Sequence, residues 1–176
     1  MVGCDPTYGT GGDSSSNTSA NILDCRTNEQ VGEFTINSSE FKPDVFAEWS
    51  IALCKMFHGA TLIWEGNGPG ADFTRKVIDL GYPNIYMREV KGTAVKKKTN
   101  KPGFWSVGSD RADLLGGSVR GGGLEEGVRR GVTNQEGGFI IRSLPLIKEC
   151  YEYVFENGKV VHRGSKESRS QAERGE

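Results

Sequence analysis

The chain has 176 residues, enough for one ordinary domain with a hydrophobic core, and no apolar run approaches the roughly 20 residues of a membrane span. Its formal net charge of −1 excludes a uniformly basic nucleic-acid-binding protein but not a local basic patch. Apolar residues make up 35% of the chain and glycines number 25, a composition that predicts many loops.

The first half of the chain predicts a strand, a hairpin, a helix and a buried strand, in that order. A polar loop over residues 6–18 separates the first strand from the hairpin. Pro43 suits the first turn of the helix, and Gly59 ends its apolar spacing. The elements are a strand over 2–5, hairpin strands over 20–25 and 30–36, a helix over 43–58 and a strand over 61–65.

The second half continues with alternating short elements and long polar loops. A glycine loop over residues 66–70 leads into a helix, and residues 116–138 are glycine-rich and carry no assignment. We predict one domain over residues 1–163 and a flexible polar tail over 164–176. The elements are a helix over 71–80, a strand over 84–87, a loop over 88–103, a strand over 104–107, a helix over 109–115, a strand over 139–142, a helix over 144–156 and a strand over 159–162.

This order predicts an α/β fold: a mixed sheet with an antiparallel hairpin and parallel strands, and helices on both faces. The helix over 43–58 is a crossover that returns the strand over 61–65 beside, and parallel to, the strand over 2–5. Parallel neighbours end at the same edge of a sheet. We therefore expect Asp5 and Glu65, at the two strand ends, to lie about 5 Å apart.

Two carboxylates this close repel each other unless a cation lies between them. Mg²⁺ or Mn²⁺ suits such ligands, and two such ions about 3.5–4 Å apart would form a two-metal site for phosphodiester hydrolysis. Asp13 lies in the polar loop after Asp5, where the loop can return it as a third ligand. The alternative is that Asp5 and Glu65 are ordinary turn residues and that Asp13 is a solvated loop residue.

A lysine-rich loop follows the strand over 84–87 and is expected at the same sheet edge as the acids. Its charges can hold a nucleic-acid backbone, and Arg111, which opens a helix, can bind phosphate. Solvated lysines and a surface salt bridge are the alternatives. Trp64 and Trp105 are interpreted as core residues rather than as platforms for bases. The candidate DNA-binding residues are Lys91, Lys96, Lys97, Lys98, Lys101 and Arg111.

Several motifs occur in the order seen in one protein family. They are Val2-Gly3-Cys4-Asp5-Pro6, the Gly-Thr-Gly-Gly loop to Asp13, Thr27 to Val31, Phe46-Ala47, Leu62 to Gly70, Gly81 to Tyr86, and Lys101-Pro102-Gly103-Phe104. Together they cover nearly the whole chain, which resembles the nuclease domain of tailed-phage large terminase subunits.

The resemblance implies a ribonuclease H-like fold and a metal-dependent endonuclease that cuts concatemeric DNA during genome packaging. It implies Asp5 and Glu65 as metal ligands and matches Asp13 to a loop aspartate of the family. It also implies Mg²⁺ or Mn²⁺ as cofactor, and double-stranded DNA, an ATPase motor domain and the portal as partners. The implied location is the cytoplasm of the bacterial host.

The chain departs from the family pattern near its end. The family places a further acid after the helix that corresponds to residues 144–156, and here only Glu173 and Glu176 follow, with no apolar helix to fix them. The motor's G-x-x-x-x-G-K-[ST] motif is also absent from the sequence. We expect a fragment truncated at both ends, with weak metal binding and poor cleavage.

Two other classes fit part of the pattern. Phosphate-binding ATPases of the actin and sugar-kinase type also place an Asp at the end of a first strand before a Gly-Thr-Gly loop, but they need two such domains. A DNA-binding module with an inactive acidic site is the second alternative.

Overall fold

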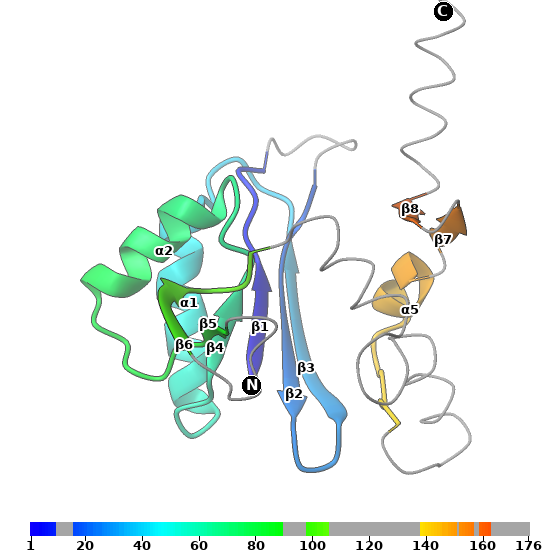
Figure 1. Ribbon diagram of the computed structural model, residues 1–176, viewed down its shortest axis with the longest axis horizontal. Coiled ribbons are helices and arrows are strands. Elements are labelled where there is room, and N and C mark those ends of the chain that lie inside the picture. The colour runs from blue at the N-terminus through cyan, green and yellow to red at the C-terminus, as the bar shows by residue number, and fades with distance from the viewer. Residues whose placement is uncertain (10–15, 90–97, 106–137, 151, 157–158, 163–176) are drawn as a thin grey trace, which may run out of the picture. The chain divides into compact units, whose positions relative to one another are not determined.

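The computed structural model describes residues 1–9, 16–89, 98–105, 138–150, 152–156 and 159–162 (Figure 1). The chain divides into two compact units, one formed by residues 1–25 and 31–106 and the other by residues 26–30 and 107–176. The helix predicted over 109–115 and the tail predicted over 164–176 lie outside the described residues. None of the helices in the described part is long and apolar enough to cross a membrane.

The first unit is built on a four-stranded sheet in which the N-terminal strand is central. Its order is β3-β2-β1-β4, with β1 antiparallel to β2 and parallel to β4. The predicted hairpin and the parallel return are therefore confirmed, and the fold is a mixed sheet with helices. The strands are β1 (Val2–Asp5), β2 (Thr18–Asp24), β3 (Glu29–Ile36) and β4 (Leu62–Trp64).

Two helices follow from clear signals in the sequence. Helix α1 (Pro43–Met56) has Pro43 at its start, and Gly59, just past its end, has a φ of 73° that favours glycine. Helix α2 (Gly70–Asp79) follows the glycine loop directly and ends before Gly81, whose φ is 65°. Both helices thus lie close to their predicted positions.

Helices α1 and α2 pack side by side over one face of this sheet (Figure 1). Cys4 and Trp64 are partners in the β1–β4 register, and they hydrogen-bond to Ser50 of α1 and Thr74 of α2. The sequence predicts helices on both faces of the sheet, but α1 and α2 both lie on the same face. The hydrophobic core is formed by residues of the sheet, of these two helices and of the segment after α2. It comprises Val2, Cys4, Ala20, Ile22, Phe46, Ala47, Ile51, Cys54, Leu62, Trp64, Phe73, Val77 and Tyr82.

Short pairings extend the sheet beyond β4. Leu62 forms a parallel bridge with Ile85, and Glu65 forms one with Phe104. Between these bridges, β5 (Met87–Glu89) and β6 (Lys98–Pro102) form a two-stranded antiparallel sheet. Part of the loop predicted over 88–103 is thus strand, because backbone pairing overrides the weak strand preference of Lys-Thr-Asn-Lys-Pro.

In the second unit, the start of β3 contacts the segment after residue 138. Glu29 bridges Ile140, and the Gln30 side chain accepts hydrogen bonds from the Arg142 and Ser143 amides at 2.8 and 2.9 Å. Helix α5 (Leu144–Cys150) then precedes the antiparallel pair β7 (Tyr153–Glu156) and β8 (Lys159–His162).

The helix predicted over residues 144–156 is therefore too long. Its last part, Tyr-Val-Phe-Glu, is strand β7 in the structure. Aromatic and β-branched residues favour strands, and Asn157-Gly158 in the sequence is a common two-residue hairpin connection. These two signals outweigh the helical spacing of the apolar residues.

Candidate functional site

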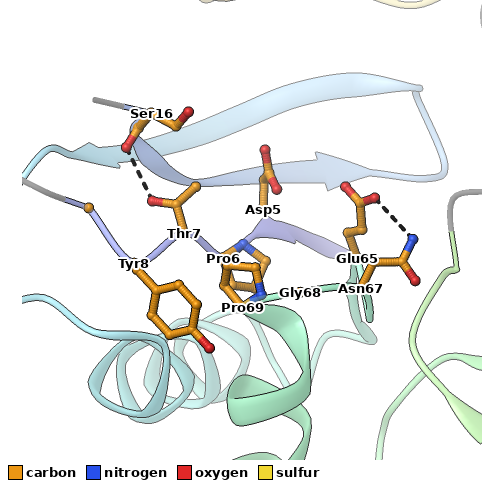
Figure 2. Close-up of a pocket in the computed structure, with 10 residues that line it drawn as sticks. Asp5, Pro6, Thr7, Tyr8, Ser16, Glu65, Asn67, Gly68 and Pro69 are labelled. Atoms are coloured by element: carbon orange, nitrogen blue, oxygen red, sulfur yellow. Dashed lines mark hydrogen bonds between the residues drawn. The ribbon is translucent and has the colours of Figure 1, made fainter. Parts of the chain in front are cut away.

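Asp5 and Glu65 lie next to each other at the carboxyl edge of the sheet. Cys4 and Trp64 are the last partners of the parallel β1–β4 pair, and the Glu65 amide donates to the Cys4 carbonyl at 3.3 Å, so Asp5 and Glu65 follow directly in the register. Neighbouring strands are about 4.8 Å apart. Figure 2 shows both carboxylates pointing to the same side of this edge. Side chains alternate along a strand, so Asp5 and Glu65 project from the face opposite to the one that α1 and α2 cover.

An open pocket of about 620 Å³ lies at this edge. It is formed by the two strand ends and the segments that follow them, which we call the first-acid loop (residues 6–9) and the second-acid loop (residues 66–69). The lining residues are Asp5, Pro6, Thr7, Tyr8, Gly9, Ser16, Glu65, Asn67, Gly68 and Pro69 (Figure 2).

The first-acid loop is held at its base by threonine hydrogen bonds. The Thr7 amide donates to Thr18 Oγ1 at 3.2 Å, and the two hydroxyl oxygens lie 3.0 Å apart. Thr7 Oγ1 also donates to the Ser16 carbonyl at 3.2 Å. Since Thr18 is 2% exposed at the start of β2, these bonds tie the chain after Asp5 to the neighbouring strand.

The second-acid loop is held by close backbone packing. A Cβ on Gly70 would lie 1.8 Å from the Glu65 carbonyl oxygen, so only glycine fits there. A Cβ on Gly66 would lie 2.9 Å from Trp105 Nε1. Asn67 Nδ2 donates to Glu65 Oε1 at a long 3.5 Å, the one dashed contact to a carboxylate in Figure 2.

Beneath this loop, a buried indole anchors β4 to α2. Trp64 is 1% exposed and its Nε1 donates to Thr74 Oγ1 at 2.7 Å. The Thr74 hydroxyl in turn donates to the Gly70 carbonyl at 2.6 Å. Trp64 is therefore a core residue, as predicted, and it fixes the strand end that carries Glu65.

Tyr8 connects the first-acid loop to helix α2. Its hydroxyl donates to Asp72 Oδ2 at 2.8 Å, and Asp72 Oδ1 lies 3.0 Å from Arg75 Nη2. The bond to Asp72 stabilises the protonated phenol and so raises the pKa of Tyr8 above its usual value. Tyr8 itself is 54% exposed.

Of the predicted DNA-binding residues, Lys101 has a described side chain, and that side chain lies near the site. Its Nζ is 5.9 Å from the centre of the Trp105 ring, and Trp105 packs against Gly66, which follows Glu65. Lys98 lies in β6, but its side chain is outside the described part. Outside the described residues altogether are Asp13, Lys91, Lys96, Lys97 and Arg111.

The donor set of the pocket fits a hard divalent cation that keeps most of its water. Two carboxylates on adjacent strand ends, in an open pocket, are typical of Mg²⁺ or Mn²⁺ bound together with substrate phosphates. The described residues contain no group of three or more His, Cys, Asp or Glu placed to hold a metal. Asp5 and Glu65 thus offer two carboxylate ligands, and every other coordination position of an ion held there would have to be filled by water, substrate or further residues.

Sequence reasoning did not identify Thr7, Tyr8, Ser16, Asn67 and Asp72 as residues at or beside the site. Thr7 and Tyr8 come within three residues after Asp5, and Asn67 stands between two glycines after Glu65. Their closeness in sequence to the two acids could therefore have identified them as site residues. Asp72 gave no such signal, because it meets Tyr8 only through the fold.

Comparisons with known proteins do not extend this picture: no protein-family model and no curated protein matches the chain.

Proposed function

We propose that this chain is a divalent-metal-dependent DNA endonuclease of the phage terminase nuclease type. The observation that carries the proposal is the adjacency of Asp5 and Glu65 at the ends of two parallel strands, pointing to one side of the sheet edge. The order of the motifs along the sequence supports the same class. In this proposal the chain works in the host cytoplasm with an ATPase motor and the portal.

The two carboxylates would hold the cation at the open pocket. The chemistry that Mg²⁺ or Mn²⁺ would supply there is activation of a water and stabilisation of charge on the leaving oxygen of a phosphodiester. The pocket is open and bordered by glycines, so a bulky anionic backbone can approach the acids. Asp13 is the proposed additional ligand.

Double-stranded DNA is the proposed substrate because a lysine, Lys101, lies over the Trp105 ring, and that ring packs against Gly66, the residue after Glu65. Lys101 and Trp105 lie on the Gly66 side of the pocket, where the lysine can contact phosphate by charge. The same segment carries the further lysines of the sequence at 91, 96, 97 and 98.

The test measures Mn²⁺-dependent DNA cleavage and Mn²⁺ binding by the full chain. Asp5→Asn and Glu65→Gln preserve shape but remove ligand charge, and we expect each to reduce cleavage by about 10²-fold or more, and chelation by EDTA to abolish it. Asp79→Asn, on the exposed end of α2, is the matched control and should leave both readouts unchanged.

Other outcomes separate the alternatives. Cleavage that survives Asp5→Asn shows that the site is wrongly assigned. Binding of DNA without cleavage under any metal condition favours the inactive DNA-binding module. Saturable ATP binding favours the actin and sugar-kinase class.

A further inference from the structure

The two acids come from chain segments that are far apart in the sequence, and one side-chain hydrogen bond joins those segments beyond the sheet. Tyr8, at the far end of the first-acid loop, donates to Asp72 in the first turn of α2, directly after the second-acid loop. The sheet sets the spacing of the strand ends, but both loops leave the sheet at the acids. The Tyr8–Asp72 bond links the first-acid loop, which lines the pocket, to helix α2.

Each partner of this bond is itself held in place. Thr7, next to Tyr8, is fixed to Thr18 by two hydrogen bonds, and Asp72 is paired with Arg75. The Asp72 side chain is 37% exposed, so the bond lies at the rim rather than in the core. The bond therefore couples the first-acid loop to the helix that directly follows the second-acid loop.

The Tyr8 hydroxyl is not placed for chemistry at the acids. Figure 2 shows the ring pointing away from the carboxylates of Asp5 and Glu65, although Tyr8 lines the same pocket. Tyr8 also lines a second, smaller pocket of about 350 Å³, together with Asp72 and Arg75. Tyr8 thus contributes to both pockets, and its hydroxyl donates to Asp72.

We propose that Tyr8 and Asp72 form a latch that fixes the two acid loops relative to each other and thereby sets the affinity of the Asp5–Glu65 pair for a divalent cation. Tyr8 is in this sense a positioning residue. The inference rests on the proposed function, because it assumes that the pair binds a cation. Its physical basis is preorganisation: ligands held at the right separation lose less freedom when the ion binds.

The test is a double-mutant cycle with Mn²⁺ titration of the full chain as its readout. Tyr8→Phe and Asp72→Ala each break the latch, and we expect each to weaken Mn²⁺ binding by about three- to tenfold, the range of one hydrogen bond. The double variant should be no weaker than the worse single variant, because both changes remove one interaction. Asp72→Asn keeps an acceptor oxygen and should restore most of the affinity.

Tyr86→Phe is the matched control, since it removes the same atom from a tyrosine that does not line the pocket. It should bind Mn²⁺ as the unmodified chain does. Hydrogen exchange gives a second readout, in which Tyr8→Phe should speed exchange of the amides in the first-acid loop and leave β1 and β4 protected.

Three outcomes overturn the latch. Equal Mn²⁺ affinity in Tyr8→Phe and the unmodified chain overturns it while leaving the proposed function intact. Additive losses in the double variant show that the two residues act separately. Absence of Mn²⁺ binding in the unmodified chain overturns both the latch and the proposed function.

Discussion

The two acid loops reach the same pocket by different physical means. The first-acid loop is tied by polar side chains, with Thr7 bonded to Thr18 and Tyr8 bonded to Asp72. The second-acid loop has one described side-chain bond, from Asn67 to Glu65, and is otherwise packed closely at Gly66, against Trp105, and just beyond its end at Gly70, against the Glu65 carbonyl. A Cβ on Gly70 would lie 1.8 Å from that carbonyl oxygen, whereas a Cβ on Gly9 of the first-acid loop would lie 2.7 Å from the Ser38 carbonyl oxygen. The junction of the second-acid loop with α2 should therefore tolerate an added atom least.

The largest expected effect is that of Gly70→Ala. The added Cβ would meet the Glu65 carbonyl oxygen at 1.8 Å, so the start of α2 must move. We expect the free energy of unfolding to fall by about 3 kcal/mol or more, as for severe overpacking, with loss of cleavage. Urea unfolding measures the first effect.

Gly68→Ala, two residues earlier in the second-acid loop, is the matched control for this change. No atom lies within 4 Å of its added Cβ, but its φ of 53° strains any other residue by about 1–2 kcal/mol. Equal losses in the two variants would show that conformation, rather than close packing, determines this loop.

A smaller effect is expected for Thr18→Val, which keeps the shape of a buried side chain but removes the bonds to Thr7. We expect the free energy of unfolding to fall by about 1–2 kcal/mol. Thr35→Val, at an exposed position of β3, should change it by about 0.5 kcal/mol or less. If urea midpoints show no difference between the two variants, the threonine bonds do not hold the first-acid loop.

The smallest effect concerns the alkaline side of the pH range. The protonated phenol of Tyr8 donates to Asp72, so its folded pKa is raised. The bond is present in full below the ordinary tyrosine pKa of about 10 and is lost as the pH rises through the folded value. The difference in tyrosinate absorbance between the unmodified chain and Tyr8→Phe isolates this titration. Asp72→Ala should move it down, and a midpoint already at the ordinary value would show that the bond is absent in solution.

Much of the first unit was predictable from the sequence because its signals are local and strong. Pro43 and Gly59 bracket the helical spacing of α1, and short apolar runs that end at Asp5 and Glu65 marked β1 and β4. The parallel return between those strands follows from the crossover helix. The location of both acids at one edge was therefore within reach of sequence reasoning.

The features that the sequence did not predict depend on contacts between residues that are far apart in the sequence. Strand β6 reads Lys-Thr-Asn-Lys-Pro, which resembles a loop until β5 pairs with it. The face covered by α2 depends on how Trp64 and Thr74 meet, and the latch depends on Tyr8 and Asp72 meeting across the fold. The glycines after Glu65 suggested access for phosphate, while Gly66 and Gly70 are required by packing against Trp105 and Glu65.

The contact between Trp105 and Gly66 has a consequence for the fluorescence of the protein. Trp64 is buried in the core, and Trp49, on α1, is 54% exposed on the helix side of the sheet. Trp105, in contrast, packs against Gly66, the residue that follows Glu65. Indole emission responds to nearby charge, so neutralisation of Glu65 changes the electric field at this ring. Trp105 is thus an intrinsic fluorophore next to Gly66, and its emission should change if an ion binds at Glu65 as proposed.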